Sequence, residues 1–347
     1  MRRSSLIRSL AATSVAFPLR AARATAAGAL TTVNIGGLLS VSDSGLLIAD
    51  QKGYFRDVGL GLNFLSFNSA ADMIASLGTG QLDVAGGAGT AGLYNAVGRK
   101  FEMKVVADRG TAKPGYGFAP LVVRKELITS GRVRSIADLK GLRMAEPAKG
   151  AVILCLMVKA LQSVGLSYDD VQHTILGFPN QVAALENGSI DATFLVEPYA
   201  TLAQMRGAVM VLEGNDKIYP DQELSVYTYS GDFARKRDLA QSFMVAYLRG
   251  ARYLLDGLEG PHFAGPKGDE IIQILQRKLK LPPSVLRKIK VGYVDPNGEV
   301  NRKSLEEDLA IYKEQHLIIG AATVGEVVDM SFAQFAAAQL GPYRSRR

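Results

Sequence analysis

The chain has little cysteine, histidine or tryptophan, and each shortage excludes a class of site. Its 347 residues include one cysteine, three histidines and no tryptophan. A single thiol excludes a disulfide framework and a site built from several thiolates. Because Cys155 lies in the apolar run VILCLMVKAL, we expect a buried, inert side chain. The histidines match no metal-ligand spacing and no catalytic motif is present, so we expect no metal and no cofactor.

The chain also lacks a long apolar run and a strongly basic body. No run approaches the roughly 18 residues of a membrane span, so we expect a soluble mature protein unless the N-terminal segment is retained as an anchor. The formal net charge is +7, but five of these charges come from arginines in the first 23 residues. The rest of the chain has a net charge of +2, which does not indicate a surface that binds nucleic acid.

The first 27 residues have the pattern of a secretory signal peptide. Arg2, Arg3 and Arg8 precede a short apolar stretch, which is followed by a run of small residues at 21–27. The pair Arg2-Arg3 also fits twin-arginine export as an alternative to the general secretory route. We therefore expect a periplasmic protein; a disordered basic leader or a wrongly assigned start is the other interpretation. Residues 341–347 are expected to form a frayed basic tail.

An internal repeat indicates two related lobes. Residues 74–89, IASLGTGQLDVAGGAG, are echoed by residues 182–198, VAALENGSIDATFLVEP. In each copy an apolar helical turn ends in glycine, and a short strand opens two residues later on Leu82-Asp83 or Ile190-Asp191. The repeat places the carboxyl end of a strand beside a helix N-terminus twice, which is a geometry that binds small molecules between lobes.

Strands and helices alternate from Thr31 onward, which predicts an α/β fold with parallel, doubly wound sheets. The segment 110–117, rich in Gly, Lys and Pro, is where we expect the chain to cross to a second lobe. A return is expected near residues 224–230, and the rest, to about residue 340, is mostly helical. Two crossings between lobes form a hinge.

These segments resemble a known family, the SsuA/THI5-like (NMT1-like) substrate-binding proteins of nitrate, sulfonate and taurine ABC transporters. The resemblance rests on ADQKGYF at 49–55, DLKG at 138–141, and ALENGSIDA at 184–192 with EPY at 197–199. It implies a type II periplasmic-binding-protein clamshell, with lobe 1 at 30–117 plus 226–340 and lobe 2 at 118–225. It also implies a monomer that captures a small organic or anionic solute, such as a sulfonate, nitrate or pyrimidine precursor, and delivers it to a membrane permease.

Candidate ligand-binding residues of the first lobe lie in two loops. Ser40 and Ser42 follow the first strand, where they either face the cleft or cap the next helix. The second loop joins a strand to a helix, and its glycines allow backbone N–H groups to approach an anion. The loop is not a P-loop, because no Lys-Ser/Thr pair follows the glycines. The alternative interpretation is a tight turn that contacts no ligand. The candidates of this second loop are Gly87, Ala88, Gly89 and Thr90.

The second lobe contributes three further groups of candidates. At 149–151 the family often has Gly-Ser; the different residues here put its hydroxyl contact in doubt, and the lysine either neutralises an acidic ligand or lies on the surface. The amides at 180–181 could bond a carboxylate or ring heteroatom, with helix capping as the alternative for Asn180. Glu197, before Pro198, either lies by the cleft mouth or holds the turn. The candidates are Lys149, Gly150, Ala151, Asn180, Gln181 and Glu197.

Two further interpretations of the sequence are open. Aromatic side chains near these loops, at 116, 118, 178 and 199, either pack on a flat solute or belong to the core. An enzyme on the same two-lobed fold, of the pyrimidine-precursor or menaquinone-pathway type, is the alternative function, since fold alone does not settle function. The cysteine-rich motif of the pyrimidine synthases cannot be present in a chain with one cysteine.

Overall fold

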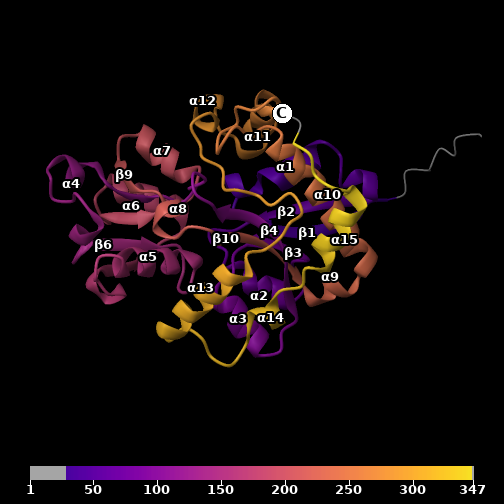
Figure 1. Ribbon diagram of the computed structural model, residues 1–347, viewed down its shortest axis with the longest axis horizontal. Helices are drawn as coiled ribbons and strands as arrows, with labels where there is room; N and C mark the ends of the chain where they lie inside the picture. The colour runs from indigo at the N-terminus through magenta and orange to yellow at the C-terminus, as the bar shows by residue number, and fades with distance from the viewer. Residues whose placement is uncertain (1–28, 346–347) are drawn as a thin grey trace, which may run out of the picture.

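Two five-stranded sheets organise the computed structural model, which describes residues 29–345. The sheets form two lobes that lie side by side along the long axis of the molecule (Figure 1). The predicted signal peptide, residues 1–27, falls outside the described residues, as do the last two residues of the predicted tail. Within the described part, no helix combines the length and apolar character needed to cross a bilayer.

The first sheet has the strand order β2-β1-β3-β10-β4. Strand β1 pairs in parallel with β2 and β3, whereas β10 pairs antiparallel with β3 and β4. The strands are β1 (Thr31–Gly37), β2 (Leu60–Ser66), β3 (Val84–Gly87), β4 (Met103–Ala112) and β10 (Gln222–Ser230).

The second sheet has the order β7-β6-β8-β5-β9 and the same design. Strand β6 pairs in parallel with β7 and β8, and β5 runs antiparallel to β8 and β9. The strands are β5 (Leu121–Arg124), β6 (Arg143–Glu146), β7 (Gln172–Ile175), β8 (Ala192–Phe194) and β9 (Val209–Glu213).

The two-lobed α/β architecture is confirmed, but the sheets are mixed rather than wholly parallel. One strand in each sheet, β5 or β10, follows directly on a crossing between the lobes, so it enters its sheet from the opposite end. The crossings occupy residues 113–120 and 214–221. The segment expected to carry the return crossing is therefore a strand inside the first sheet, and the crossing lies just before it. The exact lobe boundaries remain a prediction.

The internal repeat has a structural role at its two aspartates. An oxygen of the Asp83 carboxylate accepts from the N–H of Asn34 in β1 at 2.8 Å. The Asp191 carboxylate accepts from the N–H of Arg143 in β6 at 3.0 Å, and its pKa lies below the usual range because the bonds from that arginine outweigh burial. The preceding glycines, Gly80 and Gly188, have φ of +72° and +76°, which glycine adopts without strain. In each copy of the repeat, the aspartate therefore links its own strand to the parallel neighbouring strand by a hydrogen bond.

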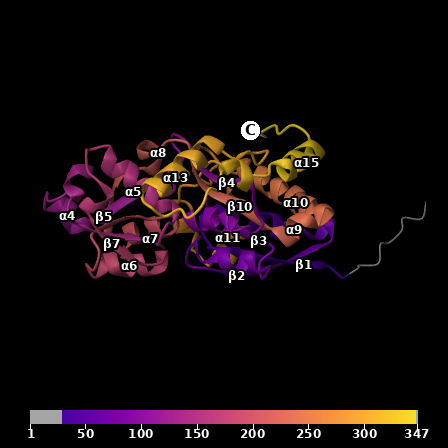
Figure 2. The ribbon, with the colours of Figure 1, turned by 90° about the horizontal axis from the view of Figure 1, so that it is seen from below.

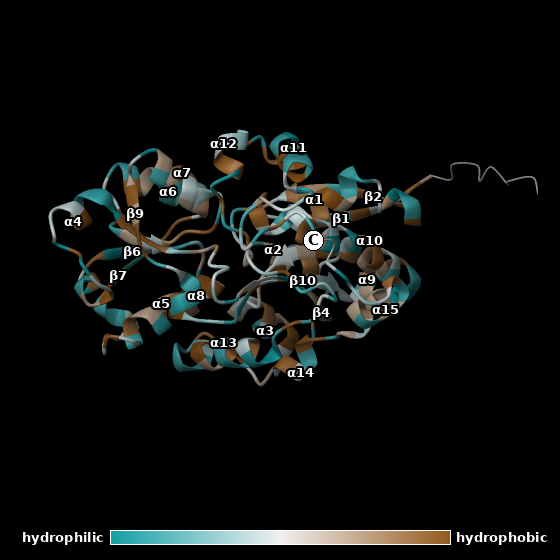
Figure 3. Cartoon of the chain, turned by 45° about the horizontal axis from the view of Figure 1, so that its top comes forward, coloured by the Kyte–Doolittle hydropathy of each residue, from teal (hydrophilic) through white to brown (hydrophobic). Residues whose placement is uncertain are grey.

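Helices cover both sheets, and the apolar residues gather on strands and inward helix faces (Figures 2 and 3). In the second lobe they are α4 (Lys125–Thr129), α5 (Val152–Gln162), α6 (Phe178–Glu186) and α7 (Tyr199–Met205), and α8 (Asn215–Ile218) lies in the return crossing. In the first lobe they are α1 (Ser44–Gln51), α2 (Met73–Gly78), α3 (Ala91–Gly98), α9 (Gly231–Arg235), α10 (Arg237–Leu255), α11 (Gly268–Leu279), α12 (Pro283–Leu286), α13 (Arg302–Glu314), α14 (Val324–Val327) and α15 (Ser331–Leu340).

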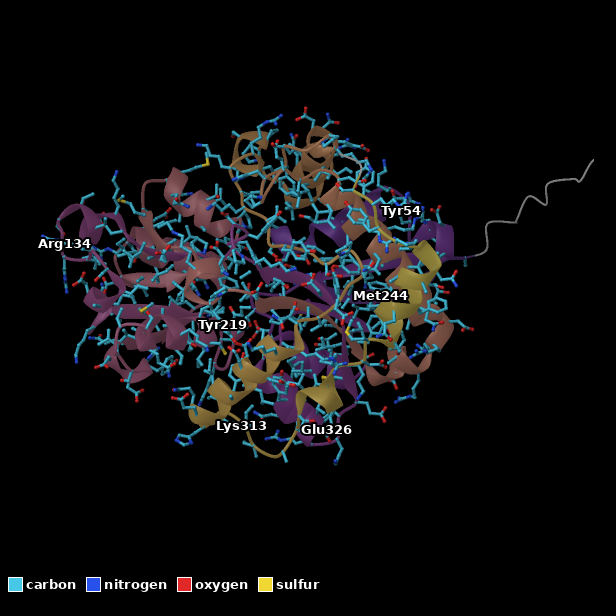
Figure 4. The ribbon with its side chains drawn as sticks, in the orientation of Figure 1. Tyr54, Arg134, Tyr219, Met244, Lys313 and Glu326 are labelled. Atoms are coloured by element: carbon cyan, nitrogen blue, oxygen red, sulfur yellow. The ribbon has the colours of Figure 1, made fainter. Side chains whose placement is uncertain are left out.

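Helix α13 packs against both lobes. It contacts β10 and α3 of the first lobe and α5 of the second. Lys159 of α5 pairs with Glu307 at 3.2 Å, and the hydroxyl of Tyr219, in the return crossing, donates to the Ser304 carbonyl at 3.4 Å. Figure 4 shows Tyr219 where the lobes meet, with Arg134 at the far end of the second lobe. Cys155 also packs here, fully buried as expected, and burial raises the pKa of its thiol.

Candidate functional site

A cavity lies between the lobes, at the carboxyl ends of β1, β3 and β6. Its volume is about 40 Å³, and residues of both lobes line it. That is room for a few water molecules and too little for a solute of several heavy atoms. The cavity is where the topology of two α/β units predicts a binding site.

Backbone hydrogen bonds join the two lobes beside this cavity. The N–H of Ala91, at the start of α3, donates to the carbonyl of Gly150 at 3.0 Å. The N–H of Val41 donates to the carbonyl of Glu197 at 3.3 Å. These contacts and the small volume show that the structure is a closed form.

The first lobe supplies every polar side chain on the cavity wall. We call this set the polar wall: Ser40, Ser42, Arg109 and Ser225. The two serines at 40 and 42 follow β1, the arginine lies on β4 and Ser225 on β10. The Ser225 hydroxyl donates to the Gly87 carbonyl at 3.1 Å, so the polar wall is fixed to the end of β3.

Arg109 is held by a buried carboxylate behind the polar wall. Its Nη2 donates to Oδ1 of Asp43 at 2.6 Å, and both side chains are 1% exposed. Nη1 donates to Ser225, and Nε has no hydrogen-bond partner among the described residues. Burial disfavours the charge, but the Asp43 carboxylate outweighs this and holds the pKa of Arg109 above its ordinary value. Asp43 also accepts from the N–H of Ser40 at 2.9 Å, which fixes the loop after β1.

The opposite side of the cavity is apolar. The second lobe and the crossing into it contribute side chains at the start of α5 and α6, after β6 and β8, and at residue 118. We call this set the apolar wall: Phe118, Pro147, Val152, Ile153, Phe178 and Val196. Its polar groups are those of the backbone, including the N–H groups of the first turn of α5.

Five of the residues proposed from the sequence are brought together at the cavity. Ser40 and Ser42 belong to the polar wall, Gly87 and Ala88 close it at the end of β3, and Ala151 lies opposite, at the N-cap of α5. At Gly87 a Cβ would meet Ala70 and Met73 at 3.3 Å, so a larger side chain would be forced against the neighbouring segment.

Four other candidates lie next to the cavity but point elsewhere. Thr90 caps α3, its hydroxyl accepting from the N–H of Leu93 at 3.3 Å. The Gly89 carbonyl accepts from the Tyr312 hydroxyl at 3.1 Å. Lys149 and Gly150 line a separate hollow, with Glu146, Tyr168 and His173.

The remaining candidates have structural partners in the second lobe. Helix α6 begins at Phe178, because Pro179 suits its first turn, so Asn180 is an exposed residue inside the helix and not its cap. Gln181 is buried and donates to the Leu176 carbonyl at 2.6 Å. The Glu197 carboxylate accepts from the N–H and hydroxyl of Thr201 at 3.1 and 2.8 Å, and burial raises its pKa to about 7.

Sequence reasoning missed Arg109, Asp43 and Ser225. Arg109 lies inside strand β4, which continues to Ala112. The available signal was a charged pair, Asp108-Arg109, directly after the apolar residues at 105–107. Phe118 and Phe178, considered as aromatic contacts, do lie on the cavity wall.

A second polar cluster lies outside the cavity, in the hollow lined by Lys149. Glu146 is 1% exposed and accepts from the Tyr168 hydroxyl; its other oxygen has no partner among the described residues. Nδ1 of His173 lies 3.2 Å from this carboxylate, and Nε2 lies 2.8 Å from the Tyr168 carbonyl. Burial lowers the pKa of His173, but the neighbouring Glu146 carboxylate and the bond to the Tyr168 carbonyl outweigh burial and raise it overall. The cluster joins β6 to β7.

Comparison with known proteins finds a family model that matches more than half of the chain. The model of the family described as NMT1/THI5 like matches residues 42–257. A relative from Escherichia coli (strain K12), named as an aliphatic sulfonates-binding protein, is 26% identical over 183 residues. The match covers 53% of this chain and 52% of the relative, so the chain spans about half the length of that protein.

Two solved structures show the same fold. The alkanesulfonate-binding protein SsuA from Xanthomonas axonopodis pv. citri, bound to MOPS, has a TM-score of 0.69 at 20% identity, covering 88% of this chain and 99% of that one. The periplasmic nitrate-binding protein NrtA from Synechocystis PCC 6803 has a TM-score of 0.73 at 15% identity, covering 90% and 89%. The predicted periplasmic-binding-protein clamshell is thereby confirmed.

Proposed function

Since the chain belongs to the NMT1/THI5-like family, we propose that it is an exported solute-binding protein that closes its lobes on a small organic or anionic solute. In this proposal the closed form delivers the solute to an ABC permease from the periplasm. The observation that carries it is a cavity between two lobes joined by two crossings, with residues of both lobes on its wall.

The physical basis is domain closure. A solute that contacts both lobes stabilises the closed state relative to the open one by its difference in affinity for the two states. The backbone bonds from Ala91 to Gly150 and from Val41 to Glu197 can form only when the lobes meet. Closure is thus a state that a permease can distinguish from the open form.

Binding rather than catalysis is supported by the chemistry of the wall. Among the described residues that line the cavity, Arg109 is the one titratable side chain, and it is already paired. Cys155 is buried on α5 with its thiol against the Asp308 carbonyl at 3.9 Å, and burial raises its pKa. A buried neutral thiol is a poor nucleophile.

The test is thermal denaturation of residues 28–347 with a panel of sulfonates, carboxylates, inorganic anions and pyrimidines. A solute that binds the folded state with micromolar affinity should add about 4 kcal/mol at millimolar concentration. Recovery of the compound unaltered separates a binding protein from an enzyme. No shift with any compound, or consumption of one, would contradict the proposal.

Export is tested separately. Residues 1–27 fused to a reporter should direct it to the periplasm. The Arg2→Lys, Arg3→Lys variant of the fusion distinguishes the two routes, because only twin-arginine export requires that pair. Retention of the unmodified fusion in the cytoplasm would contradict the proposed location.

A further inference from the structure

A carboxyl group of the second lobe is enclosed where the two lobes meet. Glu197 follows β8 and is 4% exposed. Its backbone carbonyl accepts from the N–H of Val41, in the loop after β1, at 3.3 Å. Its carboxylate faces the backbone N–H and the charge of Lys290, in the segment after α12. Both partners belong to the first lobe, so Glu197 is covered from two sides only when the lobes are closed.

The other partners of Glu197 do not belong to the first lobe. The two carboxylate oxygens accept from the N–H and the hydroxyl of Thr201, in α7, at 3.1 and 2.8 Å. The N–H of Glu197 donates to the carbonyl of Phe118, in the first crossing, at 2.9 Å. When the lobes separate, the carboxylate therefore keeps its bonds from Thr201 but loses the cover of the first lobe and regains water.

The charged groups around this carboxyl are mostly paired or exposed. A hollow of about 740 Å³ adjoins it, between the two crossings, the end of β9 and the segment after α12. Lys217 pairs there with Glu213 at 3.0 Å, and the lysines after α12 are exposed, so solvent screens their charges. In the loop after β1, the charge of Asp43 is paired with Arg109. The charged side chains that line the hollow with Glu197 are Glu213, Asp216, Lys217, Lys288 and Lys290.

Burial therefore decides the protonation of Glu197 in the closed form. It raises the pKa of this carboxyl from about 4.5 to about 7, against the bonds from Thr201 and the influence of Lys290, which lower it. In the open form the bonds from Thr201 remain and the cover of the first lobe is lost, so the carboxyl ionises at a lower pH. The closed form thus binds a proton that the open form releases.

We propose that closure of the lobes is coupled to the uptake of one proton by the Glu197 carboxyl, so that acidic medium favours the closed state and alkaline medium opposes it. This inference rests on the proposed function and adds a means of regulating its closure. By linkage, the ratio of closed to open molecules falls by up to about tenfold for each pH unit between the two pKa values of the carboxyl. A solute held between the lobes is therefore released more readily as the pH rises.

A disulfide trap between the lobes measures closure without a solute. A Cβ placed on Gly177, before α6, would lie 3.1 Å from the Cβ of Asn68, which follows β2 in the first lobe. The Cβ atoms of a disulfide lie about 3.5–4.5 Å apart, so cysteines at these two positions can bond in the closed state and are separated in the open one. Gly177 has a φ of −58°, which any residue adopts, and Cys155 is buried and does not compete.

The test is the rate of disulfide formation in the Asn68→Cys, Gly177→Cys protein at about pH 6 and about pH 8.5, with and without Glu197→Gln. Glutamine is uncharged at both pH values, and the thiols are the same in both proteins, so the ratio of the two rates reports the charge of Glu197 alone. The rate with Glu197→Gln, divided by the rate without it, should be about tenfold higher at the alkaline pH than at the acidic one.

Glu213→Gln is the matched control in the same trap. Glu213 lines the same hollow, but its burial is outweighed by the bonds from Lys217 and Gly214, which hold its pKa below the ordinary value. Its carboxyl is therefore charged at both pH values, and the corresponding ratio of rates should not change with pH.

A second readout does not depend on Glu197→Gln. Carboxyl-carbon NMR follows the titration of Glu197 in the Asn68→Cys, Gly177→Cys protein, oxidised and reduced. The oxidised form is held closed, so its Glu197 carboxyl should titrate at a higher pH than that of the reduced form.

The outcomes separate this inference from the proposed function. A ratio of rates for Glu197→Gln that stays constant with pH, or the same titration of Glu197 in the oxidised and reduced forms, would overturn the proton coupling while leaving a solute-binding protein. Absence of the disulfide in every variant at both pH values would mean that the lobes do not close on each other, which would overturn both.

Discussion

At the scale of the residue, Arg109 and Asp43 form a buried ion pair beside the cavity. Both side chains are 1% exposed, so each charge has lost most of its hydration and depends on the other. The pair also joins β4 to the loop after β1, and Arg109 lines the cavity.

Asp43→Asn should lower the free energy of unfolding by about 3–5 kcal/mol, because it leaves the buried guanidinium without a counter-charge. Urea denaturation measures the change. Arg287→Gln is the control, since its pair with Asp269 is exposed and should contribute about 1 kcal/mol at most. A loss below 1 kcal/mol for Asp43→Asn would contradict this account of the pair.

Glu197→Gln should change the pH dependence of stability. Burial raises the pKa of Glu197 from about 4.5 to about 7, so the folded protein holds a proton that the unfolded chain releases. The associated stability is fully present below pH 4.5 and is lost as pH rises through 7. Relative to the variant, the wild type should lose about 3 kcal/mol between pH 4 and 8. Parallel curves of unfolding free energy against pH would contradict the raised pKa.

At the scale of the element, local pattern determined most strands and helices, whereas the crossings depended on tertiary structure. The repeat predicted β3 and β8 because Gly80 and Gly188 and the aspartates after them are local signals. The segment SVYTYS has strand character, but nothing in it shows that β10 lies between β3 and β4, so the sequence predicts the return crossing at β10 and not just before it.

The same limit applies to the site. Loops after strands were predictable as cavity walls, and Ser40, Ser42, Gly87, Ala88 and Ala151 do lie there. The position of Arg109 on the cavity wall could not be predicted, because it depends on the ion pair with Asp43, 66 residues away in sequence. An ion pair between residues so far apart leaves no periodic pattern in a single sequence.

Thr90→Ala should lower the free energy of unfolding by about 1 kcal/mol, because the Thr90 hydroxyl satisfies the N–H of Leu93 in the first turn of α3. Thr79→Ala is a suitable control: its hydroxyl bonds carbonyls of its own helix and is exposed, so the change should stay within about 0.5 kcal/mol. Thermal or urea unfolding of the two variants provides the comparison, and equal effects would argue against capping by Thr90.

At the scale of the whole molecule, closure rests on a close approach at Gly150. This residue has φ of +69°, and a Cβ placed on it would lie 2.8 Å from the Cβ of Ala91 across the cleft. The backbone bond between these two residues needs that approach. A side chain at 150 therefore opposes the closed state specifically.

Gly150→Ala should shift the lobes toward the open state and weaken solute binding by about tenfold or more, because the apparent Kd rises as the closed fraction falls. Small-angle scattering should show a larger radius of gyration. Gly165→Ala is the matched control, with φ of +77° and no atom within 4 Å of its Cβ position. It carries the same backbone strain without the clash, so equal effects on Kd would rule out steric opening.

The position of β10 also sets an order of assembly. Strands β3 and β4 do not pair with each other in the native sheet; β10 lies between them and pairs with both. The whole second lobe is encoded between β4 and β10, so it forms a continuous stretch of chain that can collapse by local contacts as it is synthesised. The first sheet, in contrast, is complete only after residues 222–230 have emerged. Because this pairing is long-range, we expect the first lobe to fold more slowly than the second.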